Sequence, residues 1–272
     1  MQRFTRFVQE RYEPVARYKI GITEAGDAGL DLSWANKLDT VDGAIVITKC
    51  ISPEFYDAVL SNKDRLIVHA TFTGYGHSVL EPNVPPPYEE FDAIMALERA
   101  GFPKEKIVIR VDPIIPTPKG INTAKNVFKT FMDVGFSRFR VSIIDMYPHV
   151  RERFKEAGLP LPYGEHGFSP STEQVRAVGE MLEDAERYWF NIGRQELFSD
   201  VLRIESCAEP GLKNACRCGC ISGYDMDLLG LPEDEPDSFG YQRPNCLCYS
   251  GKTELLKHKE RCPHGCLYCY WR

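Results

Sequence analysis

Short runs of apolar and β-branched residues recur along most of this chain, and stretches with helical spacing separate them. Six of these runs are candidate strands, at residues 18–23, 43–49, 65–73, 106–114, 139–145 and 201–207. Continuous apolar runs of this length are typical of strands that are buried on both faces. The pattern therefore predicts strands that alternate with helices along the chain.

Three of the intervening stretches place apolar residues on one helical face. Residues 87–101 end in a glycine, and residues 122–135 begin with Asn122 as a cap and also end in a glycine. Both ends match the usual start and stop signals of helices. A third helix is expected to begin at Ser171, with an apolar face made by Val175, Val178, Met181, Leu182 and Ala185.

Strands that alternate with helices predict a parallel sheet with right-handed crossovers. We therefore expect an α/β fold, a partial TIM-type (β/α)6 barrel, with residues 1–209 as the barrel domain. Functional side chains of such barrels gather at the carboxyl ends of the strands. Any one polar residue there can be a cap or a solvated loop residue, but six polar strand ends together favour a common site. These ends carry Glu24, Asp27, Lys49, Cys50, Thr73, Tyr75, Arg110, Asp112, Asp145, Tyr147, Cys207 and Glu209.

Composition narrows the class of protein. The chain has 272 residues, of which 43% are hydrophobic and 26% charged, and these are ordinary values for a globular protein. A net charge of −6 gives no general electrostatic reason to bind nucleic acid. No apolar run is long enough to span a membrane, and the N-terminal residues lack the apolar stretch of a signal peptide. We expect a cytoplasmic protein.

Cysteines are concentrated near the end of the chain. Nine of the ten lie between Cys207 and Cys269, and Cys50 is the exception. In the cytosol such thiols are more often metal ligands or catalytic groups than disulfides. Residues 210–272 are therefore predicted to form a cysteine-rich, metal-binding segment. Within it, residues 230–245 are rich in Pro, Asp, Glu and Gly, which predicts a surface loop.

The last part of the chain carries the most specific pattern. Cys262, Cys266 and Cys269 form a C-x3-C-x2-C set that is followed at once by Tyr270. Three thiols this close together cannot all pair as disulfides. Their spacing suits three irons of a 4Fe–4S cluster and leaves the fourth iron open. An open iron is a reaction site as well as an electron store.

With the intervening residues, this set reads CPHGCLYCY, which resembles the cluster motif of radical SAM enzymes. It is similar to the HGCxYCY form of the spore photoproduct lyase-like branch. Three further segments resemble that branch: residues 47–50 (ITKC), residues 81–85 (EPNVP) with Glu89 and Glu90 after them, and residues 112–116 (DPIIP). In the branch the cluster motif comes first, whereas here it comes last.

From about residue 40 to the end, the chain more closely resembles a bacterial and archaeal family with this circularly permuted order. That family has a WTK strand end, a TGYG–EPNVP segment, an RxDPI segment, a CAE segment and a final CxHGCxYCYA. Two departures stand out: the family's N-terminal SRRTDIP-type segment is not visible, with residues 24–27 in its place, and Cys50 replaces an asparagine. The permutation predicts that residues 201–207 take the place of the first barrel strand. The chain end would then fold over the barrel mouth, within reach of Lys49 and Thr73.

The resemblance implies an enzyme that cleaves S-adenosylmethionine reductively at a 4Fe–4S cluster and so starts radical chemistry on a substrate. A reductant such as flavodoxin or ferredoxin would supply the electron. The expected roles fall into three groups. The cluster ligands are Cys262, Cys266 and Cys269; the residues that bind S-adenosylmethionine are Lys49, Thr71, Thr73, Glu24 and Tyr268; the candidates for catalysis are Arg110, Asp112, Tyr75 and Cys50.

Within the second group, Lys49 matches the branch's lysine and is the first candidate for the methionine carboxylate, with Arg110 as the second. Glu24, Thr71 and Thr73 are acceptors for the amino group. Tyr268 would lie against the adenine.

A second metal centre is also expected. The positions that match the permuted family are Cys207, Cys220, Cys246 and Cys248, and Cys216 or Cys218 could replace one of them. Four thiolates could hold an auxiliary 4Fe–4S cluster. Zinc is the rival, although C-x-C spacing is less usual for zinc than C-x2-C.

The alternative function is a zinc- or cluster-stabilised binding protein without S-adenosylmethionine chemistry. The substrate of the enzyme is open. The likeness to a DNA-repair branch allows a nucleic acid or nucleoside, and the acidic charge argues mildly against nucleic acid. A small metabolite, a peptide and a modified nucleoside are the other open alternatives.

Overall fold

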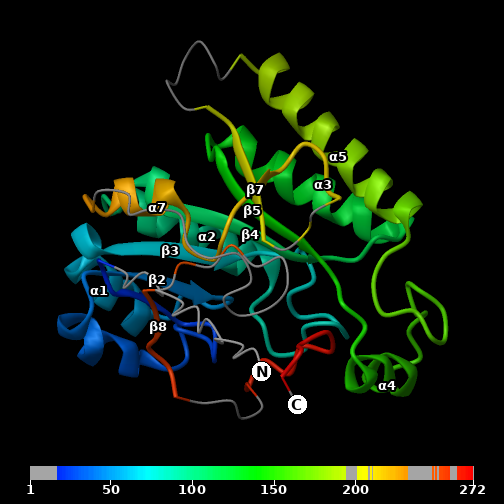
Figure 1. The fold of residues 1–272 in the computed structure, drawn as a ribbon, viewed down its shortest axis with the longest axis horizontal. Helices are drawn as coiled ribbons and strands as arrows, with labels where there is room; N and C mark the ends of the chain where they lie inside the picture. Colours follow the sequence, from blue (N-terminus) through cyan, green and yellow to red (C-terminus); the bar gives the residue numbers. More distant parts are fainter. Residues whose placement is uncertain are drawn as a thin grey trace, which may run out of the picture.

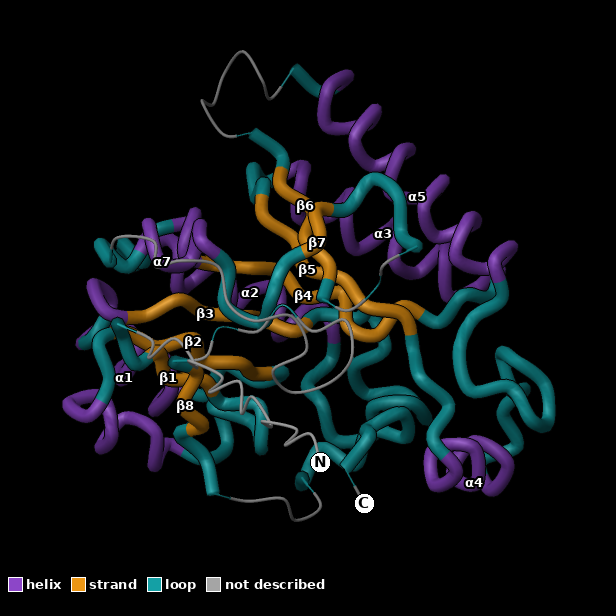
Figure 2. The backbone as a smooth tube through the Cα atoms, viewed as in Figure 1, coloured by secondary structure: helices purple, strands orange, loops and turns teal. Residues whose placement is uncertain are grey.

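The computed structural model describes residues 17–193, 201–207, 209, 211–231, 247, 249, 251–257 and 262–271. The strands within these residues form one eight-stranded sheet, and all neighbouring strands are parallel. The sheet order is β7-β6-β5-β4-β3-β2-β1-β8, so the sheet is open (Figures 1 and 2). This is the α/β fold of a partial TIM-like barrel. The strands are β1 (Ile20–Ile22), β2 (Gly43–Thr48), β3 (Leu66–Thr71), β4 (Ile107–Ile114), β5 (Arg138–Ile143), β6 (Arg203–Ser206), β7 (Cys216–Arg217) and β8 (Lys252–Glu254).

All six strands predicted from the apolar runs are confirmed, with small shifts of their ends. They were recognisable because both faces are covered; every residue of β3, for example, is buried. The sequence pattern did not predict β7 and β8, which are two and three residues long and carry mostly polar side chains.

The position of β8 corrects one expectation. Residues 201–207 contain β6, which pairs with β5 and so continues the sheet in chain order. They do not take the place of a first barrel strand. That place, beside β1, belongs to β8, which pairs with β1 from Ile20↔Lys252 to Ile22↔Glu254. The loop with Cys262, Cys266 and Cys269 follows β8 along the chain.

The helices are α1 (Pro53–Ser61), α2 (Pro87–Arg99), α3 (Pro118–Asp133), α4 (Pro148–Glu156), α5 (Thr172–Asn191) and α7 (Gly223–Leu228), with 3-10 turns η1 (Leu32–Thr40), η2 (Lys63–Arg65) and η3 (Lys104–Lys106). The predicted ends of α2 and α5 are confirmed: Gly101 follows α2 with a positive φ of 89°, and Ser171 caps α5 in a capping box. The predicted Asn122 cap of α3 is wrong. Thr117 caps this helix by accepting from the Gly120 N–H, and Pro118 occupies its first turn, where a missing N–H costs nothing.

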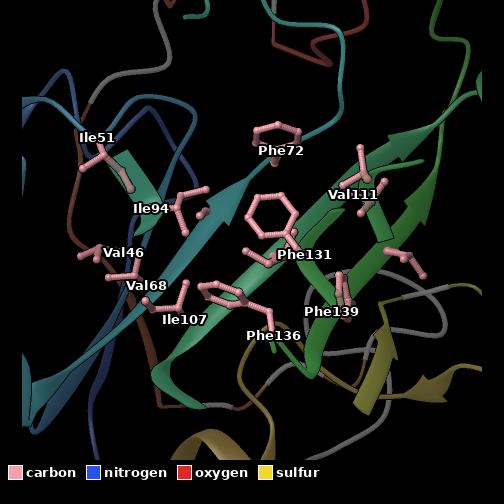
Figure 3. Close-up of a cluster of buried hydrophobic side chains, with 14 of the residues drawn as sticks. Val46, Ile51, Val68, Phe72, Ile94, Ile107, Val111, Phe131, Phe136 and Phe139 are labelled. Carbon is pink, nitrogen blue, oxygen red and sulfur yellow. The ribbon is translucent and has the colours of Figure 1, made fainter. Parts of the chain in front are cut away.

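The main core lies between the sheet and the helices on its outer face. Phe131 of α3 is fully buried there (Figure 3). Its ring packs edge-on against the rings of Phe72 and Phe136, with ring centroids 4.9 and 5.5 Å away. Side chains of β2, β3 and β4, such as Val46, Val68 and Ile107, complete this layer (Figure 3). The close packing fixes the strands relative to one another and so fixes the positions of their polar ends.

A second, smaller core fills part of the inner face of the sheet. It contains Ile20, Ile22, Ile45, Ile67 and Val108 from the strands and Ile221, Met226 and Tyr249 from the cysteine-rich segment. We call residues 218–231 the plug. This segment starts beside the end of β6 and reaches Gly43, the first residue of β2.

Most of the predicted surface loop at residues 230–245 lies outside the described residues. No helix in the described part of the chain combines the length and apolar character that a membrane crossing requires.

Candidate functional site

The cysteine loop, residues 262–271, packs on the segment that follows β3. The Asn83 side chain donates to the Pro263 carbonyl at 2.8 Å, and the Leu267 N–H donates to the Leu80 carbonyl at 3.0 Å. From the other side, Arg153 of α4 donates to the carbonyls of Cys269 and Trp271, at 2.8 and 3.0 Å. These contacts are made by backbone atoms of the loop, so they fix the path of the loop without using its thiols.

His264 ties the same loop to the ends of β1 and β2. Its side chain is buried, and its Nε2 lies 2.9 Å from Oδ2 of Asp27. The Asp27 carboxylate also accepts from the Thr48 hydroxyl at 2.6 Å and from the backbone N–H of Lys49 at 2.7 Å. Burial opposes the charge of His264, but Asp27 outweighs burial and raises the pKa of the imidazole. The loop and the two strand ends are therefore joined through one buried carboxylate.

Lys49, Thr73 and Tyr268 converge on Glu81, which is 1% exposed. The Lys49 ammonium is 2.9 Å from both Glu81 Oε1 and the Tyr268 hydroxyl. The Thr73 hydroxyl donates to the same carboxylate oxygen at 2.7 Å, and the Tyr268 hydroxyl donates to it as well. Burial opposes the charge of Lys49, but the Glu81 carboxylate outweighs it, so the pKa of Lys49 is raised. The lysine stays charged here and already has a carboxylate partner.

The three loop thiols lie close enough to influence one another. Burial raises the pKa of Cys266 to about 12; the ammonium of Lys49 acts against this shift, and Cys269 and Cys262 add to it. Burial also raises the pKa of Cys262. Among the described residues, no group of three Cys, His, Asp or Glu side chains is already arranged around a single point as metal ligands.

The donor set nevertheless suits an iron–sulfur cluster: three soft thiols on one short loop, with the half-buried Lys49 ammonium beside them. The raised pKa values of Cys262 and Cys266 favour the thiol form of these two side chains. Because the thiolate is the ligand, they must release protons when metal binds.

Arg110 and Asp112 lie further along the inner face, at the end of β4. They form an ion pair, and the Ser142 hydroxyl of β5 donates to the same carboxylate. Thr71 of β3 pairs with Arg110 of β4. On the other side of β3, Thr48 of β2 pairs with Ala70, so Lys49, the next residue, comes beside Thr71. Lys49, Thr71 and Arg110 are therefore neighbours across three strands.

The other predicted residues have separate surroundings. Glu24 accepts from Lys252 of β8, and this cation outweighs burial and lowers the pKa of the carboxyl. Tyr75 is half-buried, and burial raises the pKa of its phenol to about 12. Cys50 is also half-buried; burial raises the pKa of its thiol to about 11, and the carboxylates of Glu90 and Asp27 contribute. The structure thus places Cys50 beside Glu90 and Asp27.

The second group of cysteines meets at the end of β6. Cys207 Sγ lies 3.8 Å from Cys220 Sγ. The N–H of Cys218 donates to the Ser206 carbonyl at 2.9 Å, which extends the β6–β7 pairing and brings Cys218 beside Cys207. Cys216 is exposed. The predicted ligands Cys246 and Cys248 lie outside the described residues.

The sequence pattern gives no role to several residues of the site, among them Ser142 of β5 and the following three. Glu81 and Asn83 belong to the EPNVP segment, and the resemblance of this segment to the radical SAM branch implies no role for either residue. His264 lies inside the cysteine motif, where only the thiols and Tyr268 were given roles. The shared signal is a polar residue inside an otherwise recognisable motif.

Comparison with known proteins gives one match. No curated protein and no solved structure matches the chain. One family model, described as "Domain of unknown function (DUF1848)", matches residues 33–271, which include all the site residues described above except Glu24 and Asp27. The chain therefore belongs to the DUF1848 family.

Proposed function

We propose that the protein is a radical SAM enzyme whose 4Fe–4S cluster is held by Cys262, Cys266 and Cys269. The observation that carries this proposal is the seating of the cysteine loop. The loop follows β8, packs over the carboxyl ends of β1 to β3, and brings its thiols next to Lys49. Ligand sites of parallel barrels lie at this end of the strands.

The sheet order supports the permuted arrangement. Counted from β8, the order β8-β1-β2-β3-β4-β5 gives six parallel strands, and the cysteine loop comes after the first of them. This matches the arrangement implied by the radical SAM resemblance, with the chain opened at a different point. In this reading β6 and β7 extend the sheet beyond the six strands.

The cluster, when bound, would supply the electron that cleaves a carbon–sulfur bond of S-adenosylmethionine. The chain's own residues would hold the cofactor in place. Lys49 contacts the Tyr268 hydroxyl of the loop and would bind the methionine carboxylate by exchanging its contact with Glu81 for the ligand. The Thr73 hydroxyl and the Glu81 carboxylate are hydrogen-bonded to each other and so lie side by side. Both would accept hydrogen bonds from the amino group of S-adenosylmethionine.

We place the substrate next to Arg110, Asp112 and Ser142. These residues form a polar group on the inner face, beyond Thr71 from the cysteine loop. A balanced set of one cation, one carboxylate and one hydroxyl suits a polar substrate such as a nucleoside or a small metabolite. A reductant such as flavodoxin or ferredoxin would deliver the electron.

The test is anaerobic reconstitution with iron and sulfide, followed by reductant and S-adenosylmethionine. We expect 5′-deoxyadenosine to form, and we expect Cys266→Ala to abolish its formation. Cys216→Ala, at an exposed thiol, is the matched control and should retain it. Reconstituted protein that binds iron but never cleaves S-adenosylmethionine would favour the metal-stabilised binding protein.

A further inference from the structure

Arg153 of α4 carries a further inference, because this half-buried cation is bound to the backbone of the cysteine loop. Its guanidinium donates to the Cys269 carbonyl at 2.8 Å and to the Trp271 carbonyl at 3.0 Å. Cys269 is one of the three proposed cluster ligands, so one of these bonds ends on the backbone of a ligand. The planar fork of a guanidinium can hold two acceptors in a fixed geometry. Arg153 therefore brings both a positive charge and a defined contact to this end of the loop.

No ion pair neutralises Arg153 within the described part of the chain. Its polar partners there are the two loop carbonyls, which are uncharged. Glu152 and Glu156, the acidic residues of the same helix, are exposed, so water and salt screen their charges. The guanidinium therefore adds positive charge to the surroundings of the loop.

Two other cationic side chains near the loop bring their own counter-charges. The Lys49 ammonium lies 2.9 Å from the Glu81 carboxylate. The His264 imidazole lies 2.9 Å from the Asp27 carboxylate. In these two pairs the negative partner offsets the positive one. Arg153 differs from both because its bonds to the loop leave its charge uncompensated.

Further hydrogen bonds connect the guanidinium to the rest of the loop. The Cys269 N–H donates to the Cys266 carbonyl at 3.2 Å, so the backbones of two proposed ligands are joined to each other and to Arg153. The Trp271 indole donates to the Glu24 carbonyl at 3.4 Å, which ties the same end of the loop to the end of β1. Hydrogen bonds from a charged donor are stronger than those between neutral groups. The contact with Arg153 is therefore well placed to act on the ligands.

A cluster would make this loop negatively charged. The three cysteines bind as thiolates, and the electron from the reductant adds one more negative charge. The net charge around a cluster is one of the factors that set its reduction potential. We propose that Arg153 is a positioning residue that holds Cys269 and compensates the negative charge of the loaded loop, and so raises the reduction potential of the cluster. This inference rests on the proposed function, since it takes Cys262, Cys266 and Cys269 as the ligands.

Arg151 provides a matched control on the same helix. It is also half-buried, and its guanidinium also donates to two backbone carbonyls, those of Met146 at 3.3 Å and Gly167 at 3.0 Å. Neither carbonyl belongs to the cysteine loop. Replacing Arg151 therefore removes the same kind of contact from α4 without changing the charge bound to the loop.

The test is a redox titration of the reconstituted full chain, followed by electron paramagnetic resonance. Arg153→Gln removes the charge and should lower the midpoint potential. At one applied potential the ratio of reduced to oxidised cluster should fall about tenfold, the order expected when one unit charge is removed beside a partly buried site. Arg153→Lys keeps the charge and should stay close to wild type, as should Arg151→Gln. Loss of the cluster from Arg153→Gln but not from Arg153→Lys would equally support the role of the charge.

Amide hydrogen exchange of the metal-free protein separates charge from mechanical support. Residues 262–271 should exchange faster in both Arg153 variants than in wild type, because each variant loses the two-pronged contact. A potential that stays at the wild-type value in Arg153→Gln would overturn the inference and leave Arg153 as a mechanical anchor only. Equal falls in potential for Arg153→Lys and Arg153→Gln would also overturn it. Wild type that assembles no cluster on the three cysteines would instead refute the proposed function, and the inference with it.

Discussion

Glu90 offers a prediction whose size follows from the structure. This glutamate lies in the first turn of α2 and is 4% exposed. One carboxylate oxygen accepts from the Ile51 N–H at 3.2 Å, and the other is buried without a hydrogen-bond partner among the described residues. Burial raises the pKa of Glu90 from an ordinary 4.5 to about 7. The nearby Asp27 carboxylate adds to the shift, and the Ile51 N–H, His264 and Lys49 oppose it.

A folded-state pKa above the unfolded value means that the folded protein binds this proton more tightly. The stabilisation is therefore complete below about pH 4.5 and is lost as the pH rises through 7. At 1.36 kcal/mol per pH unit, the shift corresponds to about 3 kcal/mol, of which about 2.5 kcal/mol is lost between pH 5 and pH 8. Glu90→Gln imitates the protonated carboxyl and should escape this loss.

The assay is urea unfolding of wild type and Glu90→Gln between pH 5 and pH 8. The variant's free energy of unfolding, minus that of wild type, should rise by about 2.5 kcal/mol across this range. Other titrating groups cancel in the difference. Glu89→Gln, at the exposed neighbouring position, is the control and should show no such rise. A flat difference for Glu90→Gln would refute the reasoning, because it would mean that the buried carboxyl is not selectively protonated.

Three further predictions concern stability and the seating of the loop. Asp225→Ala removes a buried carboxylate that lies 2.5 Å from Arg138. It should lower the free energy of unfolding, measured by urea denaturation, by about 3–5 kcal/mol. A loss below about 1 kcal/mol would contradict the buried pairing. Thr117→Ala should cost about 1 kcal/mol as the cap of α3, whereas Asn122→Ala should cost almost nothing; the reverse order would restore Asn122 as the cap. Asn83→Ala removes the hydrogen bond to the Pro263 carbonyl and should speed amide hydrogen exchange across residues 262–270 about five-fold, as measured by mass spectrometry. Exchange in α5 should not change. Equal rates for residues 262–270 in variant and wild type would count against this anchor.

The sequence was most informative about the covered strands. Their six apolar runs are visible because helices and the plug bury both faces, and parallel pairing then brings the strand ends together. The short strand β8 was not predictable, because its Lys252 and Glu254 serve as ion-pair and hydrogen-bond partners of the β1 end and leave no apolar pattern. Without β8, residues 201–207 were assigned to its place.

The candidate site was partly predictable for a related reason. Lys49 and Thr73 were visible as polar residues at strand ends. Their common partner Glu81 lies eight residues after Thr73 in a loop, and only the folded path of that loop aims its carboxylate at the strand ends. The family resemblance already grouped Cys207 with Cys220, and the β6–β7 register shows how the fold brings their sulfur atoms to 3.8 Å.

In the function that we propose, the cysteine loop holds a 4Fe–4S cluster with an open iron beside Lys49. Electron paramagnetic resonance of the reduced, reconstituted protein tests it most directly, because a ligand on the cluster changes the cluster's spectrum. Adding S-adenosylmethionine should shift the spectrum of wild type, and Lys49→Met should require more of the cofactor for the same shift. A cluster signal that stays unchanged at saturating S-adenosylmethionine would show that no open iron binds the cofactor.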